Sequence, residues 1–320
     1  MTEPAPDLTV DDIEAAAARI RGVAVRTPLV RLPLDDAPAE IWLKLETLQP
    51  IGAFKIRGAA NAIAMATTAQ LAHGVFTCSA GNMAQGVAWM ARERGVRCTA
   101  IVPDHAPAAK LDAIARLGGR VIKVPFADWW QVMITHRYEG LDGFFVHPVS
   151  DPRVMAGNGT IGLEILEDLP EVDTVIVPYG GGGLACGIAT ALRARNPSAR
   201  VVASEVETSA AFSAALSAGA PTSIHYTPSF VDGIGSTRVL DEMWPRARAL
   251  LSGSQVVTLD AVRAAIRLLV SRVKIVAEGA GASSVAAALE ATGRTGPIVC
   301  VVSGGNIDVR VLAETLGGAH

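Results

Sequence analysis

Residues 172–189 read VDTVIVPYGGGGLACGIA. A β-branched, apolar run of strand length leads into Gly180, Gly181, Gly182 and Gly183, and then into small and apolar residues typical of a buried helix. Glycine has no Cβ, so its backbone N–H groups can converge on one anion, and the first turn of the helix adds further N–H groups and a partial positive charge. The segment therefore predicts a strand, a phosphate-binding turn and a helix of a parallel α/β sheet.

Strands and helices alternate on both sides of this segment. Thr9 and Asp12 have the spacing of a capping box, which predicts a helix through about Ile20. Hydrophobic periodicity predicts further strands at 74–79, 96–103, 120–125, 199–205 and 297–303, and helices at 82–95, 106–119, 183–196, 260–272 and after Glu278.

Two such series of strands and helices predict two domains, each an open, parallel-rich sheet flanked by helices. Composition places the joins near residues 74 and 148. The small domain is then expected over residues 74–147, and the large domain over 1–73 and 148–320.

Composition excludes several classes of protein. The 320 residues carry a formal net charge of −3, which gives no electrostatic basis for binding nucleic acid or an anionic membrane. No stretch of about 18 apolar residues lacks charges and glycines, and the acidic N-terminus does not resemble a signal peptide. The cysteines form no CxxC pair and favour a cytoplasmic protein with buried, reduced thiols at Cys78, Cys98, Cys186 and Cys300.

The glycine turn is compatible with more than one phosphate compound. Gly180, Gly182 and Ala185 satisfy the GxGxxG/A spacing of a dinucleotide site, and Glu205 ends the next strand. Read alone, this pattern indicates a nicotinamide-dependent oxidoreductase. It leaves one conspicuous segment unexplained, however, which is GAFKIRGAAN at residues 52–61.

Lys55 lies in this apolar segment, where desolvation lowers the pKa of an amine. A neutral amine can form a Schiff base with an aldehyde. A phosphate-binding turn together with such a lysine indicates pyridoxal 5'-phosphate, which carries a phosphate, an aldehyde and an aromatic ring. The neighbouring Phe54 is placed to pack on the bound cofactor.

Two further polar turns follow predicted strands. SAGNMAQG at residues 79–86 places Ser79, Gly81 and Asn82 at a helix N-terminus, which suits a substrate carboxylate or simply caps the helix. VVSGGNID at residues 301–308 places Ser303 at the carboxyl edge of a parallel sheet, where ligands bind.

Together, KLETLQPIGAFKIRGA (44–59), SAGNMAQG, VPYGGGGLACGIA (177–189) and VVSGGNID resemble the motifs of fold-type II pyridoxal-phosphate enzymes, the tryptophan synthase β-like fold. They occur in the order found in the branch that contains threonine/serine dehydratases and serine racemase. The resemblance extends over nearly the whole chain.

The resemblance implies that Lys55 is the Schiff-base lysine. It assigns the cofactor phosphate to Gly180, Gly181, Gly182, Gly183 and the amide of Leu184. It places Asn82 at the ring hydroxyl, Ser303 at the pyridine nitrogen, and Gly233 and Glu278 on the far side of the cofactor. The substrate carboxylate is received by the segment Ser79, Ala80, Gly81, Asn82 and Met83.

The reaction implied is α,β-elimination of water from an L-β-hydroxy amino acid such as threonine or serine, which gives a 2-oxo acid and ammonia. A homodimer is expected by the same resemblance. Racemases of the family carry serine at the position of Ala80, and alanine cannot transfer a proton, so little racemase activity is expected. A racemase, a β-replacement enzyme and a non-catalytic amino-acid-binding protein are the alternatives.

Several residues depart from the family pattern. Met83 replaces a usual histidine, which suggests a softer wall and a larger β-aryl substrate such as phenylserine. Ala53 replaces a serine, and Tyr179 precedes the glycines where a small aliphatic residue is usual.

VASEVETSAAF at residues 202–212 resembles the family's divalent-cation loop. Glu205 and Ser209 are in place, but Ala211 stands where an acidic ligand is usual. Two protein ligands are too few for such an ion, so no metal is predicted there.

Overall fold

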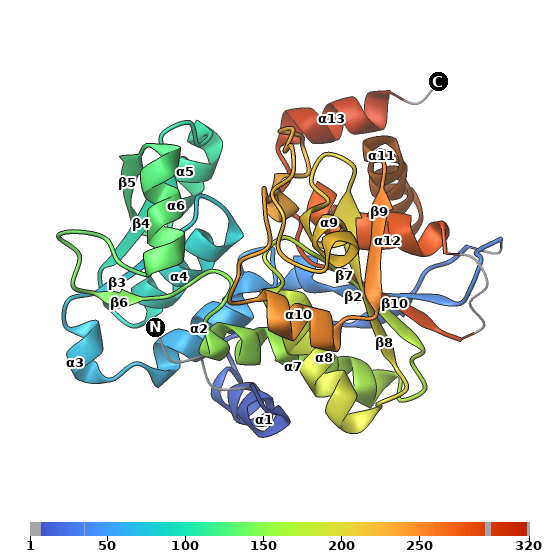
Figure 1. Cartoon of the computed structure of the whole chain (residues 1–320), viewed down its shortest axis with the longest axis horizontal. Coiled ribbons are helices and arrows are strands. Elements are labelled where there is room, and N and C mark those ends of the chain that lie inside the picture. Colours follow the sequence, from blue (N-terminus) through green and yellow to red (C-terminus); the bar gives the residue numbers. More distant parts are fainter. Residues whose placement is uncertain (1–7, 35, 292–295, 319–320) are drawn as a thin grey trace.

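The computed structural model describes residues 8–34, 36–291 and 296–318, and its strands form two separate sheets (Figure 1). The larger sheet has the order β1-β2-β10-β7-β8-β9, with strands Leu29–Arg31, Ile41–Leu45, Ile298–Val302, Thr174–Pro178, Arg200–Val206 and Gly253–Val257. The smaller sheet has the order β5-β4-β3-β6, with strands Arg120–Val124, Cys98–Pro103, Val75–Cys78 and Phe144–Phe145.

Among the described strands, β1 and β2 form the single antiparallel pair, in which Leu29 is opposite Lys44. The other pairs are parallel; Thr174, for example, aligns with Arg200 on one side and Ile298 on the other. The expected α/β fold with two parallel-rich sheets is therefore confirmed.

Helices separate most of the strands and cover both sheets. The α-helices of the described residues are α1 Val10–Arg19, α2 Lys55–Met65, α3 Thr68–Leu71, α4 Asn82–Glu93, α5 Ala108–Arg116, α6 Phe126–Thr135, α7 Pro152–Asp168, α8 Gly183–Arg195, α9 Ala211–Ala218, α10 Trp244–Leu250, α11 Leu259–Leu268, α12 Gly279–Leu289 and α13 Val309–Gly317. Short helical turns are η1 Glu46–Leu48, η2 Asp232–Ile234 and the π-helical η3 Leu269–Val273. The capping box between Thr9 and Asp12 is present at the start of α1, and the helix expected over 260–272 divides into α11 and η3.

The central strands β7 and β10 of the larger sheet are buried along their whole length, which explains why they are almost continuously apolar. Val175 and Val177 of β7 pack in one core cluster with residues of α7 and α8. Ile176, between them, packs in a second cluster with residues of α11 and α12. Alternate side chains of β7 therefore point to opposite faces of the sheet and pack in two different cores.

Close helix packing places α2, whose first residue is Lys55, beside α7. A Cβ on Gly157 of α7 would lie 2.3 Å from the carbonyl oxygen of Arg57, and one on Gly159 would lie 2.8 Å from the carbonyl oxygen of Gly187 in α8. The glycines therefore allow the backbones of three helices to approach closely, and the start of α2 is held firmly.

Below, the four-stranded unit means β3–β6 with α4–α6, at the left of Figure 1, and the six-stranded unit means the larger sheet with its helices. The domain boundaries at 74 and 148 stay a prediction.

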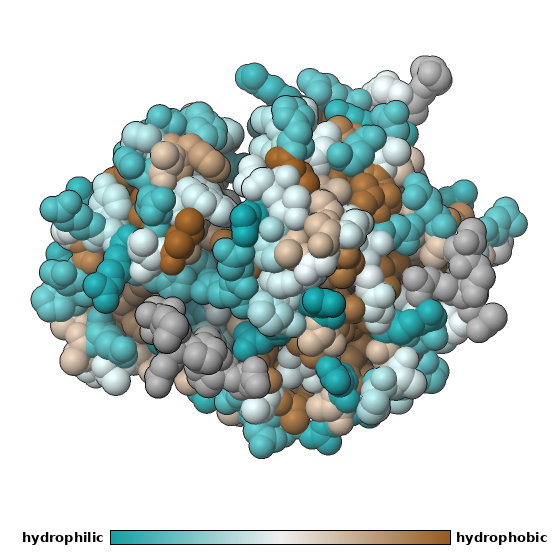
Figure 2. Space-filling model, viewed as in Figure 1, coloured by the Kyte–Doolittle hydropathy of each residue, from teal (hydrophilic) through white to brown (hydrophobic). Residues whose placement is uncertain are grey.

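The four cysteines are buried and form no disulfides. The face drawn in Figure 2 is mainly hydrophilic with scattered hydrophobic residues, and across the described ranges no helix has the length and apolar character needed to cross a membrane.

Candidate active site

Lys55 begins α2 with its side chain partly buried and without a carboxylate partner among the described residues. Its Nζ donates a hydrogen bond to the carbonyl oxygen of Pro148 at 2.7 Å and lies 5.1 Å from the centroid of the Phe54 ring. Burial lowers the pKa of Lys55 to about 8, although the charge of Glu278 opposes this shift. An appreciable fraction of the amine is therefore neutral near pH 7.

Residues 148 and 149 connect this lysine to the glycine turn. While the carbonyl of Pro148 holds Lys55, Val149 packs on the turn itself. A Cβ on Gly181 would lie 2.5 Å from Cγ2 of Val149, and one on Gly183 would lie 2.4 Å from its carbonyl oxygen. These contacts require glycine, and they fix the turn relative to Lys55.

The turn itself runs from the end of β7 to the start of α8. Gly182 is the N-cap of α8 and has φ +91, a left-handed conformation that favours glycine. The helix N-terminus begins at Gly183, so its free N–H groups face the turn. This geometry suits an anion such as a phosphate.

Tyr179 gives a second indication of a ligand at the turn. Its side chain is buried, its ring stacks on Phe212 at 4.5 Å, and its hydroxyl has no hydrogen-bond partner among the described residues. A Cβ on Gly182 would lie 2.8 Å from this hydroxyl oxygen. Burial raises the pKa of Tyr179, so the hydroxyl keeps its proton and can donate it to an acceptor at the turn.

Glu278 connects the opposite side of the turn to the four-stranded unit. A Cβ on Gly180 would lie 3.1 Å from Cα of Ile234, and one on Gly233 would lie 3.4 Å from Oε1 of Glu278. Asn82 Nδ2 donates to the same carboxylate oxygen at 2.9 Å. Burial raises the pKa of Glu278 despite this hydrogen bond.

Backbone hydrogen bonds join Glu278 to the Lys55 segment. The N–H of Glu278 donates to the carbonyl of Gly304 at 2.9 Å, and the N–H of Phe54 donates to the carbonyl of the buried Ser303 at 3.0 Å. Predicted and unpredicted residues therefore form a closed ring of contacts, which runs from Lys55 through 148–149, the glycine turn, 233–234, Glu278 and 303–304 back to Phe54.

The turn before α4 completes the site from the four-stranded unit. Ser79 Oγ accepts a hydrogen bond from the N–H of Gly81 at 3.1 Å, and α4 begins at Asn82. Residues 79–82, including Ala80, are partly exposed, whereas the Met83 side chain is buried in the core beside α2. The polar backbone of this turn is thus open to a ligand, and Met83 supports it from behind.

Sequence reasoning missed Asn306, although it lies within the VVSGGNID motif. Its Nδ2 donates to Oδ1 of Asn82 at 2.8 Å and to the carbonyl of Ile51 at 2.8 Å. Asn306 therefore orients Asn82 so that the amide of Asn82 points to Glu278. The Pro148 carbonyl was also missed, because a backbone acceptor leaves no signal in residue type.

Glu205 has a structural task away from the glycine turn. Its carboxylate accepts hydrogen bonds from the N–H groups of Phe212 (2.7 Å) and Ser213 (2.8 Å) at the start of α9, and from the hydroxyl of Ser254 (2.6 Å). Both oxygens cap α9, so Glu205 does not offer the free carboxylate that the nicotinamide interpretation requires for a ribose.

Comparison with known proteins identifies the family of the chain. The family model "Pyridoxal-phosphate dependent enzyme" matches residues 20–304. The chain belongs to this family. It is therefore a pyridoxal-phosphate dependent enzyme, and the alternative oxidoreductase interpretation is wrong.

Members of the family with two different reactions resemble the chain. An L-threonine ammonia-lyase from Thermotoga maritima is 38% identical over 310 residues, which cover 95% of this chain and 77% of that protein. A serine racemase from Oryza sativa subsp. indica is 35% identical over 323 residues, covering 96% and 93%. The structure of maize serine racemase has a TM-score of 0.88 at 33% identity and covers 97% of each chain.

The residues present fit pyridoxal phosphate. The glycine turn, the orphaned Tyr179 hydroxyl and the helix N-terminus suit its phosphate, and the unpaired amine of Lys55 suits its aldehyde.

Proposed function

We propose that the enzyme is an ammonia-lyase that eliminates water from an L-β-hydroxy amino acid of the threonine or serine type, giving a 2-oxo acid and ammonia. The observation that carries this proposal is the amine of Lys55, which has no ion pair with any residue that the structure describes and has its pKa lowered to about 8. The family contains relatives named L-threonine ammonia-lyase, which supports the same reaction.

Lys55 and the glycine turn are the central cofactor contacts in this proposal. When bound, the cofactor supplies an aldehyde for covalent attachment and a ring that withdraws electrons from the substrate Cα. The phosphate is held by the N–H groups of Gly180, Gly181, Gly182, Gly183 and Leu184, with the Tyr179 hydroxyl as a further donor. Asn82, Ser303, Gly233, Glu278 and Phe54 surround the ring.

The proton transfer is assigned to Lys55. With the substrate bound at the cofactor, the Nζ of Lys55 would accept the proton of the substrate Cα as a general base. A pKa of about 8 suits this task, because a base works best when its pKa lies near the working pH. The Pro148 carbonyl, 2.7 Å from Nζ, keeps the amine at the site.

The substrate carboxylate is assigned to the turn over residues 79–83. The N-terminal N–H groups of α4 and the Ser79 hydroxyl are donors that suit a carboxylate. Because Met83 is buried, its contribution is packing, and the carboxylate contacts come from the backbone and polar side chains around it.

Ala80 distinguishes elimination from racemisation. Racemisation needs a second group that carries a proton to the opposite face of Cα, and the methyl group of Ala80 cannot carry one. We therefore expect elimination to dominate, although serine racemases are among the relatives.

A substrate panel tests this function directly. Purified holoenzyme is given L-threonine, L-serine and L-phenylserine, 2-oxo acid formation is measured, and chiral chromatography follows the enantiomers of serine. We expect a 2-oxo acid from at least one substrate and serine racemisation at least about 100-fold slower than elimination. Rapid interconversion of L- and D-serine, or turnover of none of the three, contradicts the proposal.

Phenylserine tests the finer question of substrate size. Met83 stands where a histidine is usual, and its flexible side chain packs behind the turn, so the turn can shift for a bulky β-substituent more readily than it could over a rigid ring. We propose that phenylserine is a substrate; a kcat/KM for threonine more than about 100-fold above that for phenylserine contradicts this. The homodimer and the cytoplasmic location stay predictions.

A further inference from the structure

A cavity of about 620 Å³ lies beside the 147–153 segment, where the two units meet. It is lined by His136, Phe145 and His147 on one side and by Asp151, Ala156 and Glu242 on the other. None of the active-site residues described above lines it, so the cavity is a separate feature of the described structure.

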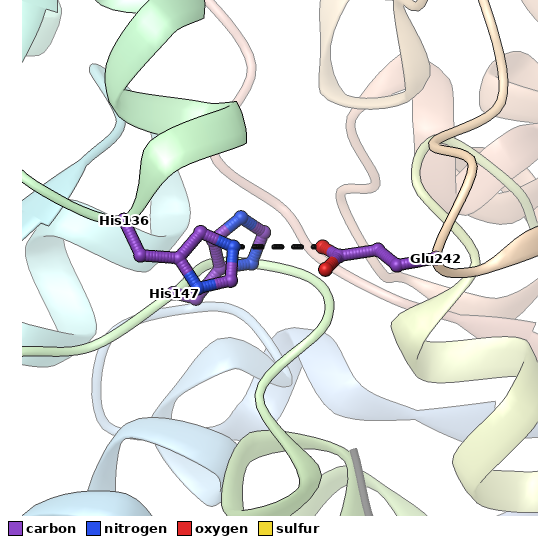
Figure 3. Close-up of side chains that lie close together, drawn as sticks. All are labelled: His136, His147 and Glu242. Atoms are coloured by element: carbon purple, nitrogen blue, oxygen red, sulfur yellow. Dashed lines mark ion pairs between the residues drawn. The ribbon is translucent and has the colours of Figure 1, made fainter. Parts of the chain in front are cut away.

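Three side chains with metal-binding atoms converge at its edge (Figure 3). His136 is the C-cap of α6, His147 follows β6, and Glu242 precedes α10. One potential ligand atom from each lies within 4.8 Å of the others. Three segments that are distant in the sequence thus bring two imidazoles and a carboxylate together.

The imidazole of His136 faces Glu242 in an ion pair rather than in a hydrogen bond. Its Nε2 is buried and lacks a hydrogen-bond partner among the described residues. The nearest oxygen of Glu242 is 3.6 Å away, which is too long for a hydrogen bond. Two ligands of a tetrahedral Zn²⁺ ion, each about 2.0–2.1 Å from the metal, lie about 3.3 Å apart, so the observed spacing is close to that of a metal site.

His147 is held in the form that a metal requires. Its Nε2 donates to the carbonyl of Met133 at 3.1 Å, which leaves the lone pair on Nδ1.

Three donor groups lie within hydrogen-bond distance of the single lone pair on His147 Nδ1. Nδ1 accepts from the N–H groups of Val149 (3.1 Å) and Ser150 (2.8 Å), and the hydroxyl of Ser150 lies 2.9 Å away. Because a ring nitrogen has one lone pair, an ion at Nδ1 would take the place of the Val149 and Ser150 donors.

We propose that His136, His147 and Glu242 bind a divalent transition-metal ion of the Zn²⁺ type. Two imidazoles and one carboxylate form a known ligand set for this ion, and water completes the coordination. The side chains of His136 and Glu242 are 41% and 44% exposed, so the cluster lies near the protein surface.

The position of the site gives the ion a bridging role. His136 belongs to the four-stranded unit and Glu242 to the six-stranded unit, so a bound ion joins the two units. His147 directly precedes Pro148, whose carbonyl holds Lys55. The ion therefore stabilises the segment that connects the units next to the active site.

Metal binding by the untagged holoenzyme tests the proposal. Unbound cofactor is removed, because free pyridoxal phosphate itself binds metals, and the protein is dialysed against a series of Zn²⁺ concentrations before bound zinc is measured by mass spectrometry. The test variants are His136→Asn and Glu242→Gln. The matched control is His105→Asn, because His105 pairs with Asp104 at 3.2 Å but gains no third ligand among the described residues.

We expect the wild type and His105→Asn to bind about one Zn²⁺ per chain and the two test variants to bind about 100-fold or more weakly. Zn²⁺ should also raise the Tm of the wild type and of the control, but not that of the test variants. Their Tm without zinc verifies that they fold. Absence of zinc binding by the wild type, or equal binding by all four proteins, overturns the proposal.

Discussion

Lys55 and Arg57 lie one turn or less apart at the start of α2, yet their side chains have opposite surroundings. Arg57 is almost fully buried, and its guanidinium contacts Glu46 at 2.8 Å and Glu164 at 2.6 Å. Lys44, also fully buried, shares Glu164 at 2.6 Å. The Nζ of Lys55, in contrast, donates a hydrogen bond to the neutral carbonyl of Pro148.

The contrast appears in the ionisation of the two side chains. Burial alone would lower the pKa of Arg57, but Glu46 and Glu164 reverse the shift and raise it. Burial also acts first on Lys55, and here the distant charge of Glu278 is too weak to compensate. A buried cation with full compensation holds helices together, whereas a partly buried amine without it is available for chemistry.

The largest expected effect concerns activity at Lys55. Lys55→Ala should lower kcat for 2-oxo acid formation by at least about 1,000-fold, because the attachment point of the cofactor and the general base are both lost. The control is Lys123→Ala, which removes an exposed lysine of β5. If Lys55→Ala keeps a tenth or so of wild-type activity, the assignment of Lys55 is wrong.

At Arg57, a substitution is expected to lower the stability of the protein. Arg57→Met should lower the free energy of unfolding in urea by about 3–5 kcal/mol, because it leaves the fully buried Glu46 without its main partner. The matched control is Arg26→Met: Arg26 also pairs with two carboxylates, of Glu167 and Asp168, but its side chain is 49% exposed, so its loss should cost less than about 1 kcal/mol. Equal losses for the two variants would show that burial does not distinguish the networks.

The sequence identified Lys55 but not the ion network beside it. A lysine among apolar residues is visible in one segment, whereas Arg57, Glu46 and Glu164 come together only when α7 packs on α2. Helix α7 was likewise not predicted from its own sequence. Its sequence contains Gly157, Gly159 and Gly162, which weaken a helix locally, and it forms because they allow close contact with neighbouring helices.

Strands with strong apolar patterns were predicted, and short or pairing-dependent ones were not. The strands over 172–178 and 297–303 were expected within two residues of β7 and β10. The three residues of β1 and the partly exposed β9 lack a comparable pattern and depend on their neighbours. In the site, side-chain motifs were found, but the Pro148 carbonyl and the His136, His147 and Glu242 cluster depend on tertiary structure alone.

Tyr179 is a neutral group at the site, and its substitution is expected to have a smaller effect than that of Lys55 or Arg57. If its unpaired hydroxyl donates to the cofactor phosphate, Tyr179→Phe should weaken cofactor binding about 10-fold, because a hydrogen bond to a charged group is lost. The dissociation constant is measured by fluorescence titration, with ³¹P NMR reporting on the phosphate environment and Tyr138→Phe as the control. Unchanged affinity together with an unchanged phosphorus signal would remove Tyr179 from the site.

The central claim is that Lys55 binds the cofactor because its surroundings leave the amine uncompensated. Pyridoxal phosphate is returned to the cofactor-free protein at a series of pH values, samples are reduced with borohydride, and the labelled peptide is identified by mass spectrometry. The lowered pKa predicts a label on Lys55, with an attachment rate that rises about tenfold per pH unit below about pH 8 and levels off above it, as the neutral amine accumulates. A label on another lysine, or a rate that still rises to about pH 10 as for an ordinary lysine, would contradict the claim.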